Sequence, residues 1–358
     1  MKHKINCLDL FCGAGGFSYG FMYEDINILL GIDNDNKAIE TYNNNHNGVG
    51  IVKDLREMKT KEVLKLIPRK NIDIIIGGPP CQGLSLSGPR MMDDPRNQLY
   101  KSFVKIVRDI KPEVVVLENV PGLVSLFKGN IKNAILDEFT SLGYQMDYKI
   151  LRASDFGVPQ HRRRVFFVGM RNKFFKFPVP CYSDEIELPT NMKRMITCSE
   201  ALSDLPLLDN ETFIGSDIQE YLCEPQNDFQ QSMRTKSKYV YNHIASVHSD
   251  KIRNIIRLVP PGKNYKALPE HLQETRKFNV AWTRFPENAP APTIDTGHRH
   301  HFHYSACRVP TVRECARIQS FPDHFIFTGN KSQQFRQVGN AVPPLLAMHL
   351  AKEIICQI

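Results

Sequence analysis

The sequence lacks a long hydrophobic run. Apolar stretches such as residues 74–76 and 114–117 are far shorter than the roughly 18 residues that a membrane-spanning helix requires. The start of the chain is basic, but Asp9 and a glycine cluster follow too soon for the apolar core of a secretion signal, which needs about 7 to 15 residues. We therefore expect a cytoplasmic protein with no membrane partner.

Paired cysteines are absent as well. Nine cysteines are scattered along the chain, and none belongs to a Cys-x-x-Cys pair. An odd number of dispersed cysteines favours reduced thiols over a disulfide framework or a zinc site. A histidine-rich stretch, residues 297–303, could supply metal ligands together with Cys307, but it lacks a four-ligand spacing. We therefore predict no metal site.

The composition that remains is that of an ordinary globular protein. The 358 residues allow about two domains at roughly 150 residues each, and 42% hydrophobic residues exclude a wholly disordered chain. The net charge of +8 is uneven: residues 1–151 carry +1, residues 152–176 carry +6, residues 184–228 carry −9 and residues 231–277 carry +7. Basic segments that contain tyrosines suit a phosphate backbone, although charge alone favours a solvated basic face.

The first 170 residues alternate buried strands with amphipathic helices. We predict strands at residues 5–10, 28–32, 72–76, 114–117 and 165–168, and helices at residues 35–44, 60–67, 98–110 and 131–142. This alternation indicates an α/β fold, a parallel sheet with helices on both faces. Prolines after residue 176 mark a boundary, and an irregular region with one clear helix at 248–258 follows. A last apolar helix is expected at about 344–355.

Three loops that follow strands suggest an adenosyl ligand. Gly13, Gly15 and Gly16 follow the first strand, and glycines there let a backbone approach a ligand closely, although the spacing is tighter than in dinucleotide loops. Asp33 ends the second strand, where an acid can accept hydrogen bonds from ribose hydroxyls. Asp54, beside Leu55, suits an adenine amino group. Each acid could instead be a turn or cap residue.

The next two strands deliver reactive side chains to the same edge. Residues 77–80, Gly-Gly-Pro-Pro, form a stiff loop that presents Cys81 outside the sheet, so a nucleophile is the favoured interpretation over an inert core thiol. Glu118 follows the neighbouring strand and suits a general acid or base, with a helix cap as its alternative. Gln160, Arg162 and Arg164 alternate before a strand, and we predict that they share one face and form a pocket wall.

These motifs together resemble the DNA cytosine-5 methyltransferase family. The ordered elements are residues 9–16, 79–82, 118–120, 160–164, 313–317 and 339–344, and the match runs from residue 5 to about 356, with residues 177–280 free of a family pattern. The resemblance implies a Rossmann-like doubly wound methyltransferase sheet, S-adenosylmethionine as cofactor and a flipped cytosine in double-stranded DNA as substrate. It also implies a smaller, irregular target-recognition domain.

The resemblance also assigns roles to single residues. Cys81 matches the nucleophile that adds to C6 of cytosine, Glu118 the residue at N3 and the exocyclic amine, Arg164 the contact to O2, and Arg162 the support of the catalytic loop. The implied cofactor positions are Phe11, Gly13, Ala14, Gly16, Asp33, Asn34, Asp54, Leu55, Pro80, Leu99, Asn340 and Val342. The implied DNA contacts are Ser85, Ser87, Arg96, Gln160, Arg284 and Thr293.

We expect a catalytic domain at residues 1–180, a target-recognition domain at 181–325 and a C-terminal segment, 326–358, that returns to the catalytic domain. The main alternatives are a tRNA cytosine-5 methyltransferase, which the missing Cys-Phe-Thr element between 177 and 280 disfavours, and a silent DNA-binding relative, which the presence of Cys81 and Glu118 disfavours. We expect a monomer of the bacterial restriction-modification type, associated with the nucleoid and paired with a restriction endonuclease. The acidic stretch 184–228 is expected to face away from the DNA.

Overall fold

The computed structural model describes residues 4–67, 71–80, 98–208, 213–273, 282–297 and 300–358. The chain divides into two compact units. Unit 1 comprises residues 1–152, 163–179 and 346–358, and unit 2 comprises residues 153–162 and 180–345.

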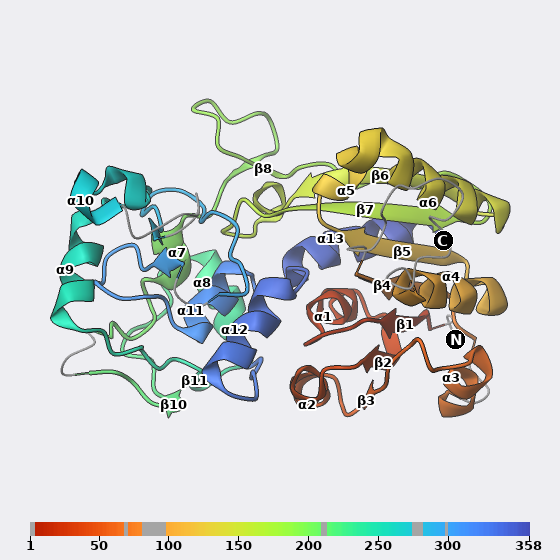
Figure 1. Ribbon diagram of the computed structural model, residues 1–358, viewed down its shortest axis with the longest axis horizontal. Helices are drawn as coiled ribbons and strands as arrows, with labels where there is room; N and C mark the ends of the chain where they lie inside the picture. The colour runs from red at the N-terminus through yellow and green to blue at the C-terminus, as the bar shows by residue number, and fades with distance from the viewer. Residues whose placement is uncertain (1–3, 68–70, 81–97, 209–212, 274–281, 298–299) are drawn as a thin grey trace. The chain divides into compact units, whose positions relative to one another are not determined.

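A seven-stranded sheet forms the centre of unit 1, in the order β3-β2-β1-β4-β5-β7-β6 (Figure 1). Its first five strands are parallel: β1 (Asn6–Leu10), β2 (Asn27–Asp33), β3 (Gly50–Val52), β4 (Ile74–Gly77) and β5 (Val114–Asn119). β7 (Arg163–Met170) and β6 (Gln145–Arg152) run antiparallel to their neighbours. The sheet is therefore mixed, which corrects the expectation of a purely parallel one.

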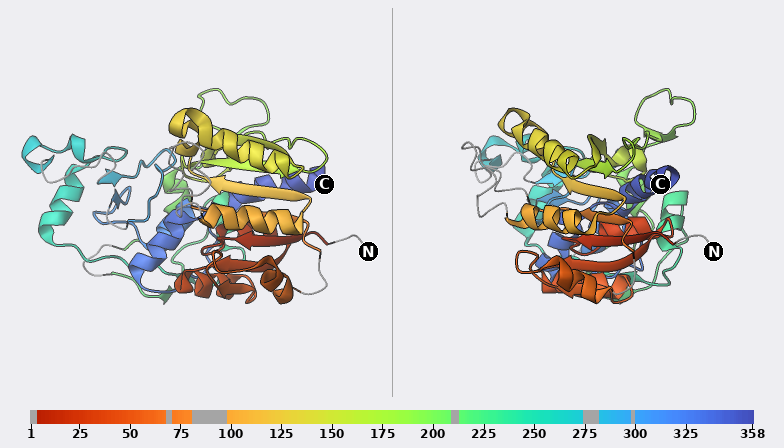
Figure 2. Two further views of the ribbon diagram at one scale, coloured as in Figure 1. Left: turned by 45° about the vertical axis from the view of Figure 1, so that its right-hand side comes forward. Right: turned by 90° about the vertical axis from the view of Figure 1, so that its right-hand side faces the viewer.

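Helices cover both faces of this sheet (Figure 2). One core joins Leu8, Ile75 and Val115 to apolar side chains of α3 (Thr60–Leu66), α4 (Gln98–Ile110) and α6 (Asn130–Ser141). On the opposite face, Phe17 of α1 (Gly16–Met22) packs edge-on against Phe166 of β7, with ring centroids 6.0 Å apart. The central strands are rich in Val and Ile because both of their faces are buried.

The order of the strands predicts a ligand-binding site at the carboxyl ends of β1 and β4. These strands are neighbours in the sheet, but β1 connects onward to β2 on one side and β4 to β5 on the other. Loops that leave adjacent strands in opposite directions open a crevice, and ligands of doubly wound folds bind there. The glycine-rich loop follows β1 and the Gly-Gly-Pro-Pro loop follows β4, so both predicted site loops lie at this point.

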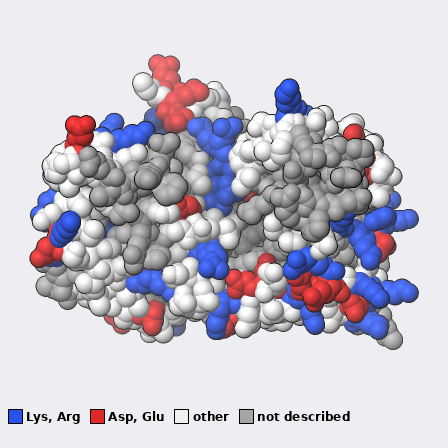
Figure 3. Space-filling model, in the orientation of Figure 1, with Lys and Arg blue, Asp and Glu red and all other residues white. Residues whose placement is uncertain are grey.

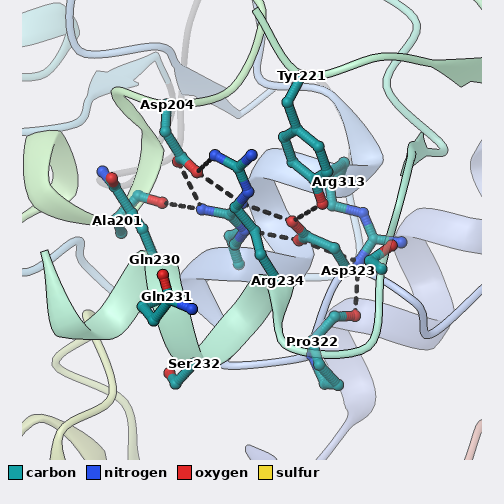
Figure 4. A network of polar contacts seen from close by, with 12 residues as sticks. Ala201, Asp204, Tyr221, Gln230, Gln231, Ser232, Arg234, Arg313, Pro322 and Asp323 are labelled. Atoms are coloured by element: carbon teal, nitrogen blue, oxygen red, sulfur yellow. Dashed lines mark hydrogen bonds and ion pairs between the residues drawn. The ribbon is translucent and has the colours of Figure 1, made fainter. Parts of the chain in front are cut away.

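Unit 2 is built from short helices: α7 (Cys198–Leu202), α8 (Asp228–Arg234), α9 (Asp250–Leu258), α10 (Glu270–Gln273), α11 (Val312–Ile318) and α12 (Lys331–Asn340). Unit 2 contains a buried ionic network in addition to apolar clusters such as that of Ile256, Trp282 and Phe302. Arg317 of α11 donates to Asp204 at 2.8 Å and to Asp323 at 2.6 Å, and Figure 4 shows these two carboxylates on opposite sides of the network. Because the pairs satisfy one another in a buried setting, α11 is held in place by charge as well as by packing.

The division into units departs from the predicted domains in two places. Residues 153–162 belong to unit 2, although they lie within the sequence expected for the catalytic domain, and the return to unit 1 comes at residue 346 rather than 326. α13 (Pro344–Gln357) contains that crossing. In unit 2, Figure 3 shows acidic side chains gathered on the loop between β8 (Tyr182–Ser183) and β9 (Lys193–Arg194). In the described part of the chain, no helix is long and apolar enough to cross a bilayer.

Candidate active site

The glycine-rich loop after β1 has a backbone conformation that only a few residue types adopt readily. Phe11, Gly13 and Gly15 all have positive φ, at 63°, 53° and 94°. A Cβ placed on Gly13 would meet no atom within 4 Å, so open space borders this backbone. A Cβ on Gly15 would instead strike the ring of His46 at 2.3 Å, which explains the need for glycine there. The loop therefore has room for a ligand on one side and protein on the other.

Asp33 connects the end of β2 to this loop. One carboxylate oxygen accepts a hydrogen bond from the backbone N–H of Gly13 at 2.9 Å, and the other accepts from the N–H of Asp35 at 2.9 Å. Burial raises the pKa of Asp33, and these two backbone donors oppose that shift. A carboxylate has about four lone-pair sites, so Asp33 keeps acceptor capacity for a ligand. Asp33 can thus fix the loop and still accept hydrogen bonds from hydroxyl groups.

A second acid lies beneath the loop. Asp9 is almost completely buried on β1 and accepts a hydrogen bond from the Ser18 hydroxyl at 2.6 Å. Burial raises the pKa of Asp9 to about 8, because an ionised carboxylate is costly away from water. Asp9 is not among the ligand-binding residues that the sequence predicts.

His46 supports the loop from behind. Its Nε2 lies 3.1 Å from the carbonyl oxygen of Gly15, and its Nδ1 lies 2.9 Å from the carbonyl oxygen of Tyr42. The His46 ring also stacks on the Tyr42 ring. Burial lowers the pKa of His46 to about 4. No pattern in the sequence pointed to this histidine, because its role depends on a contact 31 residues away along the chain.

The third predicted loop is less open to a ligand. Asp54 forms an ion pair with the Arg56 guanidinium at 2.5 Å, and that interaction lowers the pKa of the carboxyl. Leu55 is buried, at 2% exposure, so its side chain belongs to the core. A cofactor contact by Asp54 would have to use the lone pairs that Arg56 leaves. Asn34 and Pro80 are exposed and Leu99 is half-buried.

Glu118 and Arg164 meet at the carboxyl edge of the sheet. Arg164 Nε lies 2.9 Å from Glu118 Oε1, and each side chain is only 13% exposed. The contact exists because β7 runs antiparallel to β5, which brings the start of β7 beside the end of β5. Burial lowers the pKa of Arg164, while the charge of Glu118 opposes that shift. The site thus contains a preformed carboxylate–guanidinium pair.

This pair borders the loop that leads to Cys81. A Cβ added to Gly78 would lie 3.0 Å from Oε2 of Glu118, so the Glu118 carboxylate lies directly beside this loop. The Asn119 side-chain amide donates to the Pro79 carbonyl at 3.0 Å. The backbone on the amino side of Cys81 is therefore fixed against β5. Cys81 itself lies outside the described residues, as do Ser85, Ser87 and Arg96.

Gln160 and Arg162 do not form the pocket wall expected from their spacing. The strand begins only at Arg163, and both side chains are fully buried in unit 2. Gln160 accepts from the Ile294 N–H and donates to the Gln319 side chain at 2.9 Å. Its amide is thus fully occupied by protein partners. A DNA contact by Gln160 does not fit this burial.

Arg162, like Gln160, is buried and bonded to protein partners. Its guanidinium donates to the carbonyl of Ile294 at 3.1 Å and to that of Gly339 at 2.7 Å. Gly339 packs so closely on this region that a Cβ would lie 2.3 Å from the Asp295 carbonyl. Arg162 therefore positions the backbone next to Thr293 and Asn340, both predicted site residues. The predicted support of the catalytic loop by Arg162 stays a prediction, because residues 81–97 lie outside the described residues.

Two further DNA contacts are expected in unit 2, and one of these side chains is buried whereas the other is exposed. Arg284 is 8% exposed, and its guanidinium donates to backbone carbonyls that include those of Ser305 and Val259. That burial does not fit a contact to DNA. Thr293 is exposed and remains a prediction. Asn340 and Val342 also belong to unit 2.

No group of three or more metal-ligating side chains occurs within the ranges that the structure describes, which omit His298. The neighbouring histidines have protein partners or a buried setting. His300 contacts the Asp295 carboxylate, and His303 Nδ1 accepts from the Ala306 N–H at 3.0 Å.

The family model for C-5 cytosine-specific DNA methylase matches residues 5–356. The chain belongs to this family. It is therefore a DNA (cytosine-5)-methyltransferase with a Rossmann-like catalytic sheet, as the motifs predicted.

Individual proteins similar to this chain are also methyltransferases. The chain is 37% identical to the type II methyltransferase M.DdeI of Desulfomicrobium norvegicum, over 98% of this chain and 88% of the relative. It is 33% identical to the type II methyltransferase M1.HphI of Haemophilus parahaemolyticus, over 99% and 89%. Among solved structures, a prophage protein of E. coli assigned as a DNA modification methyltransferase matches with a TM-score of 0.79 and 27% identity, over 99% of both chains.

Proposed function

We propose that the enzyme methylates C5 of a cytosine flipped out of double-stranded DNA, through a covalent bond between Cys81 and C6. C5 of cytosine is a weak nucleophile, and addition of a thiolate at C6 makes it electron-rich. Glu118 would hold N3 and the exocyclic amine, and Arg164 would hold O2, as the ring gains electron density. The observation that carries the proposal is the Glu118–Arg164 pair beside the loop that leads to Cys81.

The residues at the first three strand ends fit S-adenosylmethionine. The free space at Gly13 admits a ligand against the backbone, and the Asp33 carboxylate suits a ribose diol. The Asp33 carboxylate, which two backbone N–H groups stabilise, can also supply negative charge near a cationic group. When bound, S-adenosylmethionine supplies an electrophilic methyl group. The remaining proposed contacts are Phe11, Ala14, Gly16, Asn34, Asp54, Leu55, Pro80, Leu99, Asn340 and Val342.

The protein must then complete the reaction without leaving itself alkylated. After C5 has accepted the methyl group, loss of the C5 proton to a base restores the C5–C6 double bond and breaks the bond between Cys81 and C6. The thiolate leaves with its electron pair, so Cys81 is regenerated. Flipping the target cytosine out of the duplex costs a few kcal/mol and gives Cys81, Glu118 and Arg164 access to its ring.

We also propose that the enzyme acts as a monomer and protects the site of a cognate restriction endonuclease, as expected of a chain similar to type II methyltransferases. Bisulfite sequencing of DNA from cells that express the protein tests the activity, with Cys81→Ala as the control. We expect methylation at one short sequence, and none with Cys81→Ala. Unmethylated DNA with methylation in tRNA instead would overturn the proposal.

A further inference from the structure

A left-handed turn follows the catalytic strand β5, and we name residues 126–129 the Leu126–Gly129 turn. Phe127, Lys128 and Gly129 have φ values of 53°, 58° and 86°, so three successive residues adopt a conformation that only glycine adopts readily. The two core residues on either side, Leu123 and Ile131, are at most 3% exposed. The turn is therefore anchored at both ends and its backbone conformation is imposed on it. Strain of this kind concentrates at functional sites.

The turn presents apolar side chains to solvent. Leu126 is 42% exposed and Phe127 is 37% exposed, while Val120, next to the catalytic strand end, is 53% exposed. Lys128 is exposed beside them. An aromatic ring, aliphatic side chains and one cation on a single short segment suit a partner that offers both flat apolar faces and negative charge.

The turn lies near the proposed site of chemistry. α5 (Gly122–Ser125) begins three residues after Asn119 and rises only about 6 Å over its four residues before the turn starts. Figure 1 shows α5 at the carboxyl end of β5, the edge that carries Glu118. A strand of DNA that delivers a base to Glu118 would therefore lie along the same edge of the sheet as this turn.

We propose that the Leu126–Gly129 turn binds the DNA next to the flipped cytosine. Phe127 packs against a nucleobase that the flipped base leaves unstacked, and Lys128 pairs with a backbone phosphate. Stacking on an aromatic ring tolerates any base, so this contact adds affinity without reading sequence. The inference rests on the proposed function, because it requires DNA at the Glu118 edge.

The chain offers a matched control. Lys173 and Phe174 are also adjacent and exposed, with Phe174 at 62%. They follow β7, which runs antiparallel to β5, so they lie at the opposite edge of the sheet from Glu118. Changes at Lys173 and Phe174 remove the same chemistry at a place where DNA is not expected.

The experiment compares Phe127→Ala, Lys128→Ala and Lys128→Gly with Lys173→Ala and Phe174→Ala. Binding of a duplex that contains the methylated sequence is measured by fluorescence anisotropy at several salt concentrations, and S-adenosylmethionine binding is measured separately. We expect Phe127→Ala to weaken DNA binding by roughly 5- to 100-fold, the range for one stacked base. Lys128→Ala should lower the slope of log affinity against log salt by about 0.9. S-adenosylmethionine binding and the two control variants should match the wild type.

Lys128→Gly separates DNA binding from stability. Glycine relaxes the imposed backbone conformation, so the melting temperature should rise or hold while the salt slope still falls. DNA affinity and salt slope that stay at wild-type values in the Phe127 and Lys128 variants would overturn the inference. If the wild-type enzyme methylates its sequence in that case, only the turn's role fails. If the wild type does not methylate DNA at all, the proposed function fails first.

Discussion

Arg164 and Glu118 form an ion pair across β5 and β7, with Nε and Oε1 2.9 Å apart. Both side chains are largely buried, and each satisfies the charge of the other before any substrate arrives. Such preorganisation is efficient because the protein does not have to reorient dipoles when charge develops on the substrate. The pair also explains why an arginine near the start of one strand and a glutamate near the end of another belong to the same site.

Removal of the Glu118 charge tests the pair directly. Glu118→Gln keeps the shape of the side chain but leaves Arg164 without its counter-ion and weakens the proposed contact with the cytosine ring. We expect kcat to fall by roughly 10²- to 10⁴-fold, the range for the loss of a group that transfers or stabilises a proton. The control is Glu113→Gln, just before the other end of β5. Methyl transfer from labelled cofactor measures both, and equal activity of Glu118→Gln and wild type would refute the role of Glu118.

Arg162 is predicted to matter for the stability of unit 2. Arg162→Met keeps much of the volume but loses two hydrogen bonds to buried carbonyls, those of Ile294 and Gly339. The expected loss in free energy of unfolding is about 3 kcal/mol, since hydrogen bonds to charged groups contribute more than neutral ones. Arg163→Met, an exposed neighbour, should change little. Urea unfolding measures both variants, and similar midpoints for the two would contradict the assignment.

His46 should make the fold sensitive to acid. Its pKa of about 4 lies below the usual 6.5, so its contribution to stability is complete above pH 6.5 and is lost as the pH falls toward 4. Asp9, whose pKa is raised to about 8, changes stability in the opposite direction over this range. Asp9 contributes to the pH dependence of both the wild type and His46→Leu, so the difference between the two proteins isolates the contribution of His46.

Between pH 6.5 and pH 5, the free energy of unfolding of the wild type should fall by about 1.5 kcal/mol more than that of His46→Leu. Urea unfolding at several pH values in this range provides the measurement. Parallel pH profiles for the two proteins would show that His46 does not titrate with a lowered pKa.

Asp33 is predicted to act in cofactor binding. Asp33→Asn keeps one carbonyl acceptor for the Gly13 N–H but removes the charge and part of the acceptor capacity. We expect S-adenosylmethionine to bind roughly 10- to 100-fold more weakly, because one to two charge-assisted hydrogen bonds are lost. Asp25→Asn is a suitable control, since Asp25 is exposed and its positive φ of 57° is tolerated by asparagine. Isothermal titration calorimetry checks this, and wild-type affinity for Asp33→Asn would exclude the contact.

Local sequence predicted the parts of the fold whose cause is local. The apolar runs of β1, β2, β4 and β5 and the periodicity of α4 were sufficient to place these elements, because burial on both faces or one face leaves a clear pattern. β6 (Gln145–Arg152) was missed, since it mixes polar and apolar residues and only two of its eight residues are buried. The antiparallel direction of β7 also escaped, because strand direction is set by tertiary packing.

Among the predicted site residues, the sequence predicted the positions of those whose place depends on the order of the strands. Glu118 and the glycine loop lie at strand ends, and the order of strands alone brings them to one edge. The family resemblance implied DNA contacts at Gln160 and Arg284, but their hydrogen-bond partners are backbone groups of other segments of the chain. The support of the glycine loop by His46 arises in the same way. Polarity shows that a side chain needs a partner, whereas the fold decides whether that partner is protein or DNA.

The central claim is that Cys81 forms a covalent bond to C6 of the target cytosine. A duplex in which the target is 5-fluorocytosine tests it, since fluorine replaces the C5 proton whose loss releases the enzyme. Incubation with S-adenosylmethionine and intact-mass measurement should show a protein–DNA adduct for the wild type and for Cys356→Ser, an exposed cysteine far along the chain, but none for Cys81→Ser. An adduct that persists in Cys81→Ser, or its absence from a wild-type enzyme that methylates the unmodified duplex, would contradict the account.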